Sequence, residues 1–253
     1  MLLKTILKDE YRLLTFRAPS AGIRERPGAY LAFGLVLTWV AGIGRYWDSA
    51  EATLSQHLGL GSLAYVFLLA LVLSLLVAPL GPKNWTYRNV LLFITLTSPP
   101  ALLYAVPVEM WVSPSSALAM NSSFLAIVAA WRVTLLLVFL KRAAGLRGSA
   151  ILVATLLPLA LIVDGLAFLN LEHLVYETMA GLRDAAGLSS GAQYGVVRFI
   201  CTVSALVTPF LLACYVRIAH ENQTKRKLRL ATSSDRLGTA SVMTAYGAHV
   251  RTA

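Results

Sequence analysis

The sequence predicts an all-α, multi-pass membrane protein with six transmembrane helices. The chain has 253 residues, of which 57% are apolar and 13% charged, and its mean hydropathy is +0.68. These values lie well outside the average for soluble domains. Six apolar stretches are each long enough to cross a bilayer, which takes about 20 residues. They occupy residues 27–44, 61–80, 87–106, 119–140, 149–171 and 194–218.

The distribution of lysine and arginine predicts the orientation of these spans. Eighteen of the 22 basic residues lie before the first span, after the second, after the fourth and after the sixth. The three alternate segments hold only Arg45 and Arg183. Cytoplasmic loops keep lysine and arginine, whereas short translocated loops lose them. Both termini are therefore expected in the cytoplasm, with the plasma (inner) membrane as the location.

Residues 1–26 form a cytoplasmic segment before the membrane domain, which covers residues 27–218. Its first 17 residues are amphipathic at helical spacing, which predicts a helix at the membrane interface. Docking of this helix on a partner protein is the alternative, and Glu10 interrupts the apolar side. No cleavable signal is expected, because charged residues break the apolar run. The two sides of the helix consist of Leu2, Leu3, Ile6, Leu7, Leu13 and Leu14, and of Lys4, Lys8 and Arg12.

The first span begins at Pro27, a residue tolerated in the first turn of a helix, and aromatic residues flank its outer end. The second span, 61–80, ends in a turn rich in proline and glycine. The third span, 87–106, is predicted to be broken at Ser98, Pro99 and Pro100. Each proline lacks an amide hydrogen and so cannot donate to the carbonyl four residues before it. The carbonyls of Thr95 and Leu96 therefore lose their helical hydrogen bonds. Lipid cannot satisfy these carbonyls, so protein or a water-filled cavity must do so.

The fourth span, 119–140, carries Arg132. This residue lies about 12 Å from the cytoplasmic end of its span, and the freed carbonyls lie about 12–14 Å from theirs. We therefore expect the Arg132 guanidinium, which has five donors, to cap the break in the third span. Two alternatives are extension of the side chain to the cytoplasmic surface and a substrate-binding role.

Asp164 lies in the fifth span, 149–171, and Arg198 in the sixth, 194–218. Their depths are about 10 Å and 6 Å from the outer ends of consecutive, antiparallel spans. The sequence therefore predicts a structural ion pair between Asp164 and Arg198 rather than between Asp164 and Arg132. A protonatable Asp164 in a proton pathway is the alternative.

The remaining segments are polar. A short surface helix is expected near residues 171–182, where His173 and Glu177 are too few ligands for a metal site. Residues 219–253 are predicted to form a basic, disordered cytoplasmic tail. Basic residues beside apolar spans attract anionic lipid head groups, so nucleic acid is not an expected partner. The expected lipid contacts are Lys4, Lys8, Arg12, Lys225, Arg226 and Lys227.

No enzyme is predicted. The chain has no phosphate-binding glycine loop, no G-x-S-x-G and no H-E-x-x-H, and no nucleophile lies with a base at a common depth. No cofactor or metal is expected. The sequence favours a non-enzymatic protein that organises or assists other membrane components, including other membrane proteins or copies of itself. The alternative is a small oligomeric permease or channel with its site at the broken third span and Arg132.

Overall fold

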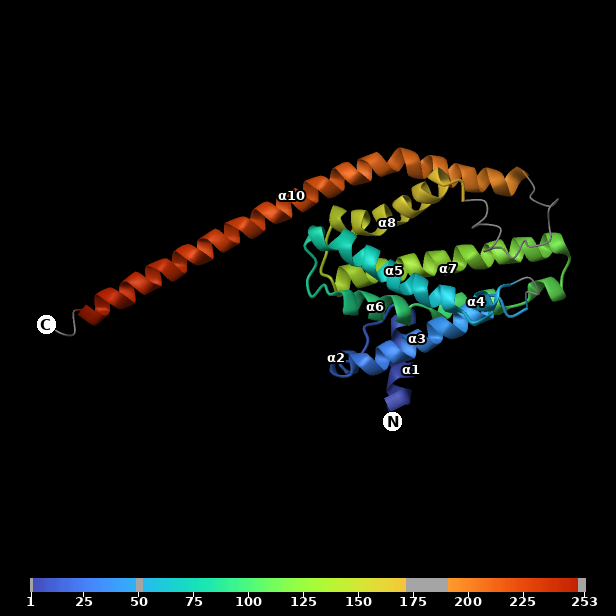
Figure 1. The fold of residues 1–253 in the computed structure, drawn as a ribbon, viewed down its shortest axis with the longest axis horizontal. Helices are drawn as coiled ribbons and strands as arrows, with labels where there is room; N and C mark the ends of the chain where they lie inside the picture. The colour runs from blue at the N-terminus through green and yellow to red at the C-terminus, as the bar shows by residue number, and fades with distance from the viewer. Residues whose placement is uncertain (1, 49–51, 172–190, 250–253) are drawn as a thin grey trace.

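The described part of the chain is helical. The structure, a computed structural model, describes residues 2–48, 52–171 and 191–249, which form helices and connecting turns without a strand (Figure 1). Five of these helices are long and apolar enough to cross a membrane, as expected for a multi-pass membrane protein. They are Pro27–Gly44, Leu60–Leu80, Ser115–Arg142, Ser149–Phe168 and Gly195–Lys225.

Successive long helices run back and forth along one axis (Figure 1). The connections at residues 81–86 and 143–148 meet at one end, where the Lys83 amide donates to the Ala144 carbonyl at 2.8 Å. We call this the basic end, because Lys83, Arg142 and Arg147 lie there, and the opposite one the far end. The elements are α3 (Pro27–Gly44), α4 (Leu54–His57), α5 (Leu60–Val77), η1 (Ala78–Leu80), α6 (Tyr87–Leu96), η2 (Pro99–Ala105), η3 (Val108–Met110), α7 (Pro114–Arg142), α8 (Ser149–Phe168) and α10 (Gly191–His249).

The predicted third span is not one continuous helix. Its α-helical part, α6, ends at Leu96, and the chain continues through η2 in the tighter 3-10 form. Every residue from Val90 to Ser98 is buried, because a helix that is apolar on all faces needs neighbours on all faces. Helices α3 and α5 pack against it, and Phe93 stacks on Phe139 of α7 with ring centroids 4.1 Å apart.

Helix α3 approaches its neighbours closely because one face carries small residues. Gly34, Thr38 and Gly42 are buried and follow each other at intervals of four residues. A Cβ atom on Gly34 would lie 2.6 Å from Thr95 Oγ1, and one on Gly42 would lie 2.7 Å from Ser62 Oγ. Small residues at this spacing let helices in a bilayer come together. Helix α3 thereby contacts both α6 and α5.

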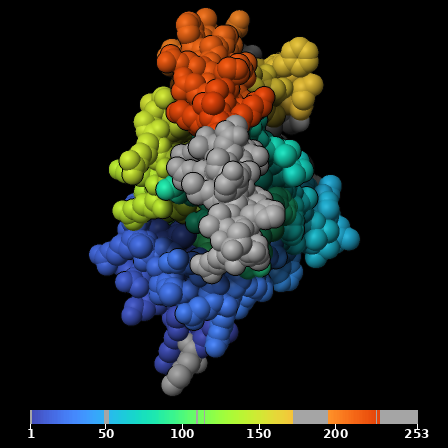
Figure 2. Space-filling view, turned by 90° about the vertical axis from the view of Figure 1, so that its left-hand side faces the viewer, coloured from blue at the N-terminus to red at the C-terminus, as the bar shows by residue number. Residues whose placement is uncertain are grey.

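Helix α10 lies on the opposite side of the bundle from α3 (Figure 1), and the end view shows it at the top with residues of α1 to α3 at the bottom (Figure 2). It packs on α8 and η1, and only 6% of its apolar stretch is buried. Its outer face exposes large apolar side chains, among them Phe199, Leu206 and Phe210. The two sides of the bundle are therefore packed very differently.

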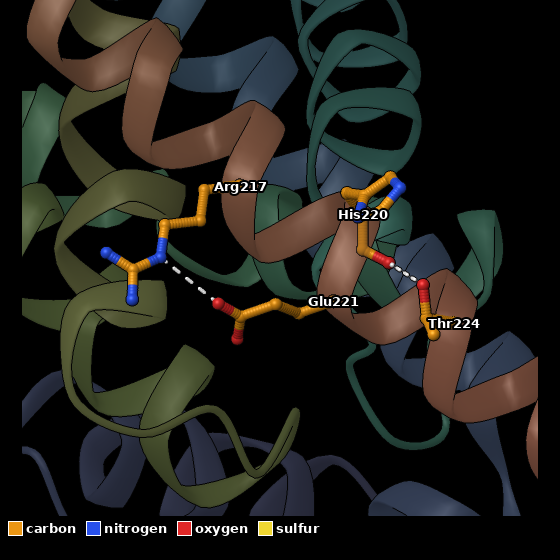
Figure 3. A network of polar contacts seen from close by, with 4 residues as sticks. All are labelled: Arg217, His220, Glu221 and Thr224. Atoms are coloured by element: carbon orange, nitrogen blue, oxygen red, sulfur yellow. Dashed lines mark hydrogen bonds and ion pairs between the residues drawn. The ribbon is translucent and has the colours of Figure 1, made fainter.

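Helix α10 also extends well beyond the basic end (Figure 1). A disordered tail was predicted from residue 219, but the helix continues to His249. The chain offers it no stop, since neither proline nor glycine occurs between Pro209 and Gly238. Arg217 and Glu221 add an ion pair of 3.1 Å at the i, i+4 spacing that supports helices, beside Thr224, which donates to the His220 carbonyl at 3.0 Å (Figure 3).

The N-terminal segment forms α1 (Leu2–Leu14) and the short α2 (Gly22–Glu25). Helix α1 runs crosswise to α3 (Figure 1). Its end is held by α7, since Trp131 Nε1 donates to the Leu14 carbonyl at 3.0 Å and Arg142 Nη1 to the Phe16 carbonyl at 2.6 Å. The face of α1 that meets the bundle contributes Ile6 to a small core with Tyr30, Leu92 and Leu96.

Candidate functional site

The break at Ser98, Pro99 and Pro100 is closed by its own chain. After Leu96 the backbone bonds shift to the i+3 partner, so the Ser98 amide donates to the Thr95 carbonyl at 3.2 Å. Thr97 Oγ1 donates to the Ile94 carbonyl at 2.9 Å. This change to 3-10 bonding is a common way to satisfy carbonyls at a helix end. The freed carbonyl of Thr95 therefore needs no partner from another helix.

The neighbouring α3 covers the break. Thr95 is 0% exposed and Ser98 4%, and the Ser98 and Thr38 hydroxyl oxygens lie 2.7 Å apart. Thr38 Oγ1 also lies 2.9 Å from the Gly34 carbonyl, to which it donates. A threonine hydroxyl has a single hydrogen, so Ser98 then donates to Thr38. The polar groups at the break are thus paired with one another in a packed environment.

Arg132 does not cap this break, contrary to the expectation from its depth. It lies half-buried on α7, and within the described residues its guanidinium makes no hydrogen bond or ion pair. Helix α7, which carries Arg132, packs against η2, which carries the phenol of Tyr104. The Thr95 carbonyl that Arg132 was expected to cap is satisfied within its own chain.

Arg45, at the far end of α3, lies on the same phenol. Its guanidinium carbon is 5.2 Å from the centroid of the Tyr104 ring, within the range of a cation–π contact. The Nε and Nη2 atoms of Arg45 are buried and donate to no acceptor among the described residues. The Arg45 guanidinium therefore lies over the Tyr104 ring with two donor nitrogens that have no described acceptor.

A close contact between α3 and η2 positions Arg45. A Cβ atom on Gly44 would lie 2.7 Å from the Ala105 Cβ, so only glycine permits this approach. Trp47 Nε1 donates to the Ala105 carbonyl at 3.0 Å. The end of α3 is thus held on both sides of Arg45 against the residue that follows Tyr104.

Asp164 pairs with a hydroxyl group on α10 and not with an arginine. Its Oδ2 accepts from Thr208 Oγ1 at 2.5 Å, while Oδ1 is buried without a partner in the described structure. Thr208 Oγ1 also lies 2.9 Å from the Ser204 carbonyl. The single hydroxyl hydrogen can serve only one of these acceptors.

The predicted ion pair between Asp164 and Arg198 is absent from the structure. Arg198 is exposed on α10, and Asp164 faces Thr208, ten residues further along the same helix. Ten residues correspond to about 15 Å of helix. The two groups therefore differ in height as well as in helix face.

Two further buried acidic residues lie next to each other on α1. Asp9 and Glu10 are 3% and 6% exposed. Asp9 accepts from the Ser20 amide at 2.9 Å and from the Ser20 and Tyr30 hydroxyls, each at 2.6 Å. Burial raises the pKa of Asp9, but these hydrogen bonds and the charge of Arg12 outweigh it and leave the pKa lowered.

The carboxyl group of Glu10 makes no hydrogen bond within the described structure. Burial raises its pKa from 4.5 to about 8, since an apolar environment disfavours the charged form. Adjacent carboxyl groups on one helix therefore differ strongly in acidity. The sequence indicated this position only as an interruption of the apolar side of the helix.

Sequence reasoning missed the contact between Arg45 and Tyr104. Arg45 is the only basic residue in its polar segment, and Gly44 beside it marks a close approach. The spacing of Gly34, Thr38 and Gly42 was also a readable signal for the packed face of α3. The pairing of these features with η2 was not readable, because it joins positions about 60 residues apart.

The described residues contain no group of three or more His, Cys, Asp or Glu side chains that could hold a metal ion. His173, Glu177 and the surface helix expected around them fall almost wholly within residues 172–190, outside the described part of the chain. The remaining geometry consists of a partly buried Arg45 on the Tyr104 ring, the contact between Asp164 and Thr208, and helix α1 packed on the bundle. No family model, no curated protein and no solved structure matches this chain.

Proposed function

We propose that this chain is a non-enzymatic integral membrane protein, with six passes and both termini in the cytoplasm, that organises or assists other components of the plasma (inner) membrane. The observation that carries the proposal is the closed break in the third pass. At this buried place the 3-10 turn satisfies the Thr95 carbonyl, and Thr38 of α3 pairs with the Ser98 hydroxyl. A protein built this way acts through its surfaces rather than through a path along its axis.

The surfaces of α1 support this proposal. Its bundle-facing side holds Ile6, Asp9 and Glu10, whereas Leu3, Leu7 and Tyr11 are exposed. The basic residues Lys4, Lys8 and Arg12 lie next to this exposed apolar strip on the helix. A helix that docks on one side can still place leucines in the acyl boundary and lysines on phosphates. The basic stretch of α10, with Lys225, Arg226 and Lys227, adds positive charge that attracts anionic lipid.

Thiol accessibility tests the closed break. Thr97→Cys and Ser98→Cys are made in a Cys201→Ala, Cys214→Ala background, and intact cells are treated with a membrane-impermeant maleimide. We expect no labelling at either position. Ser55→Cys, at an exposed position of α4, is the accessible control, because the proposed topology places it outside the cell. Labelling of Ser98→Cys at the rate of the control would contradict the proposal.

A lipid measurement tests the surface role. In vesicles containing a self-quenching fluorescent phosphatidylglycerol, we expect the protein to gather the labelled lipid around α1. The triple change Lys4→Gln, Lys8→Gln, Arg12→Gln should reduce the quenching. Its matched control changes Arg17, Arg24 and Arg26, which are exposed but lie outside α1. Equal loss in both triple variants would mean that α1 has no special part.

The alternative function is a small oligomeric permease or channel. One observation favours it: Arg132 and Arg45 present positive charge within the bundle without a described acidic partner. Helix breaks beside cationic groups form substrate sites in transporters. Anion flux into sealed vesicles that contain the purified protein, and its loss in Arg132→Gln, would favour this function over the surface role.

A further inference from the structure

Helices α8 and α10 meet through a chain of oxygen atoms. Asp164 Oδ2 accepts from Thr208 Oγ1 at 2.5 Å, and Thr208 Oγ1 lies 2.9 Å from the Ser204 carbonyl. Ser204 Oγ in turn donates to the Ala160 carbonyl at 3.2 Å. Each helix presents these groups from one face, because residues four apart lie on the same side of a helix. Carboxylate, hydroxyl and carbonyl oxygens are therefore gathered at a single contact.

The two hydroxyl residues occupy the covered side of a helix that is otherwise mostly exposed. Ser204 and Thr208 are 9% and 8% exposed, whereas Phe210 on the outer face is 74% exposed. Polar groups inside a bilayer are costly and commonly mark ion or substrate sites. Asp164 lies four residues before Phe168, where α8 ends, and thus about 6 Å from the far end of its helix. A small ion can reach the contact from that end.

The carboxyl group of Asp164 can accept more than its neighbours donate. Its Oδ1 atom is buried and has no hydrogen-bond partner in the described structure. Its Oδ2 atom competes with the Ser204 carbonyl for the one hydrogen of Thr208. Buried carboxylates are normally paired with a cation or coordinate a metal ion. The ion pair that the described residues form lies elsewhere, between Arg217 and Glu221.

We propose that Asp164, Thr208 and Ser204 form a binding site for a sodium ion between α8 and α10. Hard cations take oxygen ligands, and transporters coordinate sodium with backbone carbonyls of their membrane helices. The ligands here are the Asp164 carboxylate, the two hydroxyl oxygens and the Ala160 carbonyl. Thr208 donates its hydrogen to the Ser204 carbonyl and turns a lone pair toward the ion. The contact between Asp164 and Thr208 lengthens as the ion enters between their oxygens.

The charge and the spacing of these oxygens favour sodium over other cations. One carboxylate neutralises a single positive charge, so a divalent ion would leave an excess charge between membrane helices. The described residues also lack a group of three or more His, Cys, Asp or Glu side chains, and calcium sites use several carboxylates. Neighbouring oxygens are only 2.5–3.2 Å apart. A small ion therefore needs less movement of the helices than potassium does.

The sodium site and the proposed function can fail separately. The site lies on α8 and α10, whereas the proposed function rests on the closed break between α3 and η2. In a protein that organises the membrane, the ion strengthens the attachment of α10 to the bundle. In the alternative permease, the same ion can be coupled to transport.

The test uses the full chain, purified in a neutral detergent. The midpoint of thermal unfolding is followed by tryptophan fluorescence while sodium chloride replaces choline chloride at constant total concentration. A ligand that binds the folded chain raises the midpoint by mass action. We expect a saturable rise of about 3–6 °C when sodium reaches ten times its dissociation constant. Potassium chloride should give a smaller rise at the same concentration.

The variants assign the effect to the site. Asp164→Asn keeps the size and removes the charge, so it should abolish the rise with sodium. Thr208→Val removes one ligand and should weaken sodium binding by about tenfold or more, whereas Thr208→Ser keeps the oxygen and should retain the response. Glu221→Gln is the matched control, because it removes the same charge from an exposed position of α10, and it should respond to sodium like the unmodified chain.

Two outcomes would overturn the site. One is an equal midpoint in sodium chloride and choline chloride for the unmodified chain. The other is that Asp164→Asn responds to sodium as strongly as Glu221→Gln does. If Asp164→Asn fails to fold, Thr208→Val and Thr208→Ser are compared by direct binding of radioactive sodium. We expect saturable binding that unlabelled sodium displaces and choline does not, and equal affinity in these two variants would contradict the site.

Discussion

Helices α6 and α10 differ in what surrounds them. Helix α6 is buried from Val90 onward, and the residues at and just after its end, Thr95 and Ser98, bond to their own turn and to α3. Helix α10 contacts α8 and η1 and leaves most of its apolar stretch open. It is joined to the bundle by Leu211, Tyr215 and Ile218, which pack against the core. Side-chain hydrogen bonds add to this contact, from Ser204 to the Ala160 carbonyl, from Thr208 to Asp164, and from Asn222 to the Leu80 carbonyl.

The difference shows two ways of holding helices together where lipid is the solvent. Lipid tails are as apolar as leucine, so burial of apolar surface does not drive association between helices. On the α6 side, small residues bring backbones into contact, and the packing is sensitive to added atoms. On the α10 side, one face packs on α8 and is joined to it by single polar contacts, while the other face is exposed. On the α6 side, substitutions that add atoms should therefore cause steric clashes and a large loss of stability. On the α10 side, substitutions should cause a small loss of stability.

The largest effect is expected from Gly34→Ala. The added methyl group would lie 2.6–2.8 Å from the Thr95 side chain and 3.1 Å from its carbonyl carbon, so α3 must move away from α6. Overpacking of this kind costs about 3 kcal/mol. The free energy of unfolding in mixed micelles measures it. Gly165→Ala on α8 is the matched control, because no atom lies within 4 Å of its Cβ, and it should stabilise the helix by about 0.5–1 kcal/mol. Similar effects of both changes on the free energy of unfolding would contradict the conclusion that the α6 side is sensitive to added atoms.

The next largest effect concerns the pH dependence of α1 docking, which extends the packed side. The pKa of Glu10 is about 8 in the docked state and 4.5 in its ordinary state, so docking binds a proton between these values. Docking is therefore fully stable below about pH 4.5 and weakens as the pH rises through 8. Between pH 6 and 8 the loss should be about 2 kcal/mol.

Spin labels on α1 and the bundle measure this docking. Leu7→Cys and Leu68→Cys, both at exposed positions, are labelled in the cysteine-free background. The distance distribution should broaden as the pH rises from 6 to 9. Glu10→Gln should abolish the pH dependence and keep the narrow distribution throughout. A pH response that persists in Glu10→Gln would assign the effect to another group.

A smaller effect is expected at the α8–α10 contact. Thr208→Val keeps the volume and removes the hydroxyl group that meets Asp164, and the expected loss is about 1 kcal/mol, as for single hydrogen bonds between membrane helices. Labels on α8 and α10 should separate, while labels on α3 and α6 should not. Thr202→Val is the matched control, since the exposed Thr202 bonds only to the Arg198 carbonyl of its own helix. Loss of the α3–α6 contact in Thr208→Val would mean that the two sides are coupled.

The smallest effect is expected from Glu221→Gln. The Arg217–Glu221 pair spans 3.1 Å, but its side chains are 81% and 50% exposed (Figure 3). Exposed pairs of this type contribute about 0.5 kcal/mol or less, so the helix should continue past the bundle unchanged. Helicity by circular dichroism checks this. A clear drop in helicity would show that the extension of α10 depends on this one pair.

Much of the bundle was predictable because its causes are local. Apolar stretches, loop charges and the prolines at 99 and 100 mark where helices run and where one breaks. The partner of the break was not predictable, since the contact between Thr38 and Ser98 depends on how α3 and η2 are rotated about their axes. The same limit applies to Arg132. Depth along a helix can be counted in residues, whereas the face that a side chain occupies against its neighbour is set by packing.

The tail and the buried acidic residues also separate what local sequence indicates from what tertiary packing decides. A polar composition indicated disorder after residue 219, whereas α10 runs on to His249 in the structure. Asp164 and Arg198 suited each other in charge and depth, but Thr208 occupies the face that meets Asp164. Asp9 and Glu10 looked alike in sequence. Only the tertiary structure distinguishes them, because it provides three donors for Asp9 and none for Glu10 among the described residues.

The anchoring of the N-terminal segment has a consequence for biosynthesis. Its contacts lie far ahead in the chain, at Leu92 and Leu96 of α6, Trp131 and Arg142 of α7. The ribosome adds about 5–20 residues per second, so the segment emerges many seconds before its last partner is made. The first helix to be translated is therefore among the last to reach its final position. During this interval its leucines and lysines can hold the nascent chain at the membrane surface until the bundle is complete.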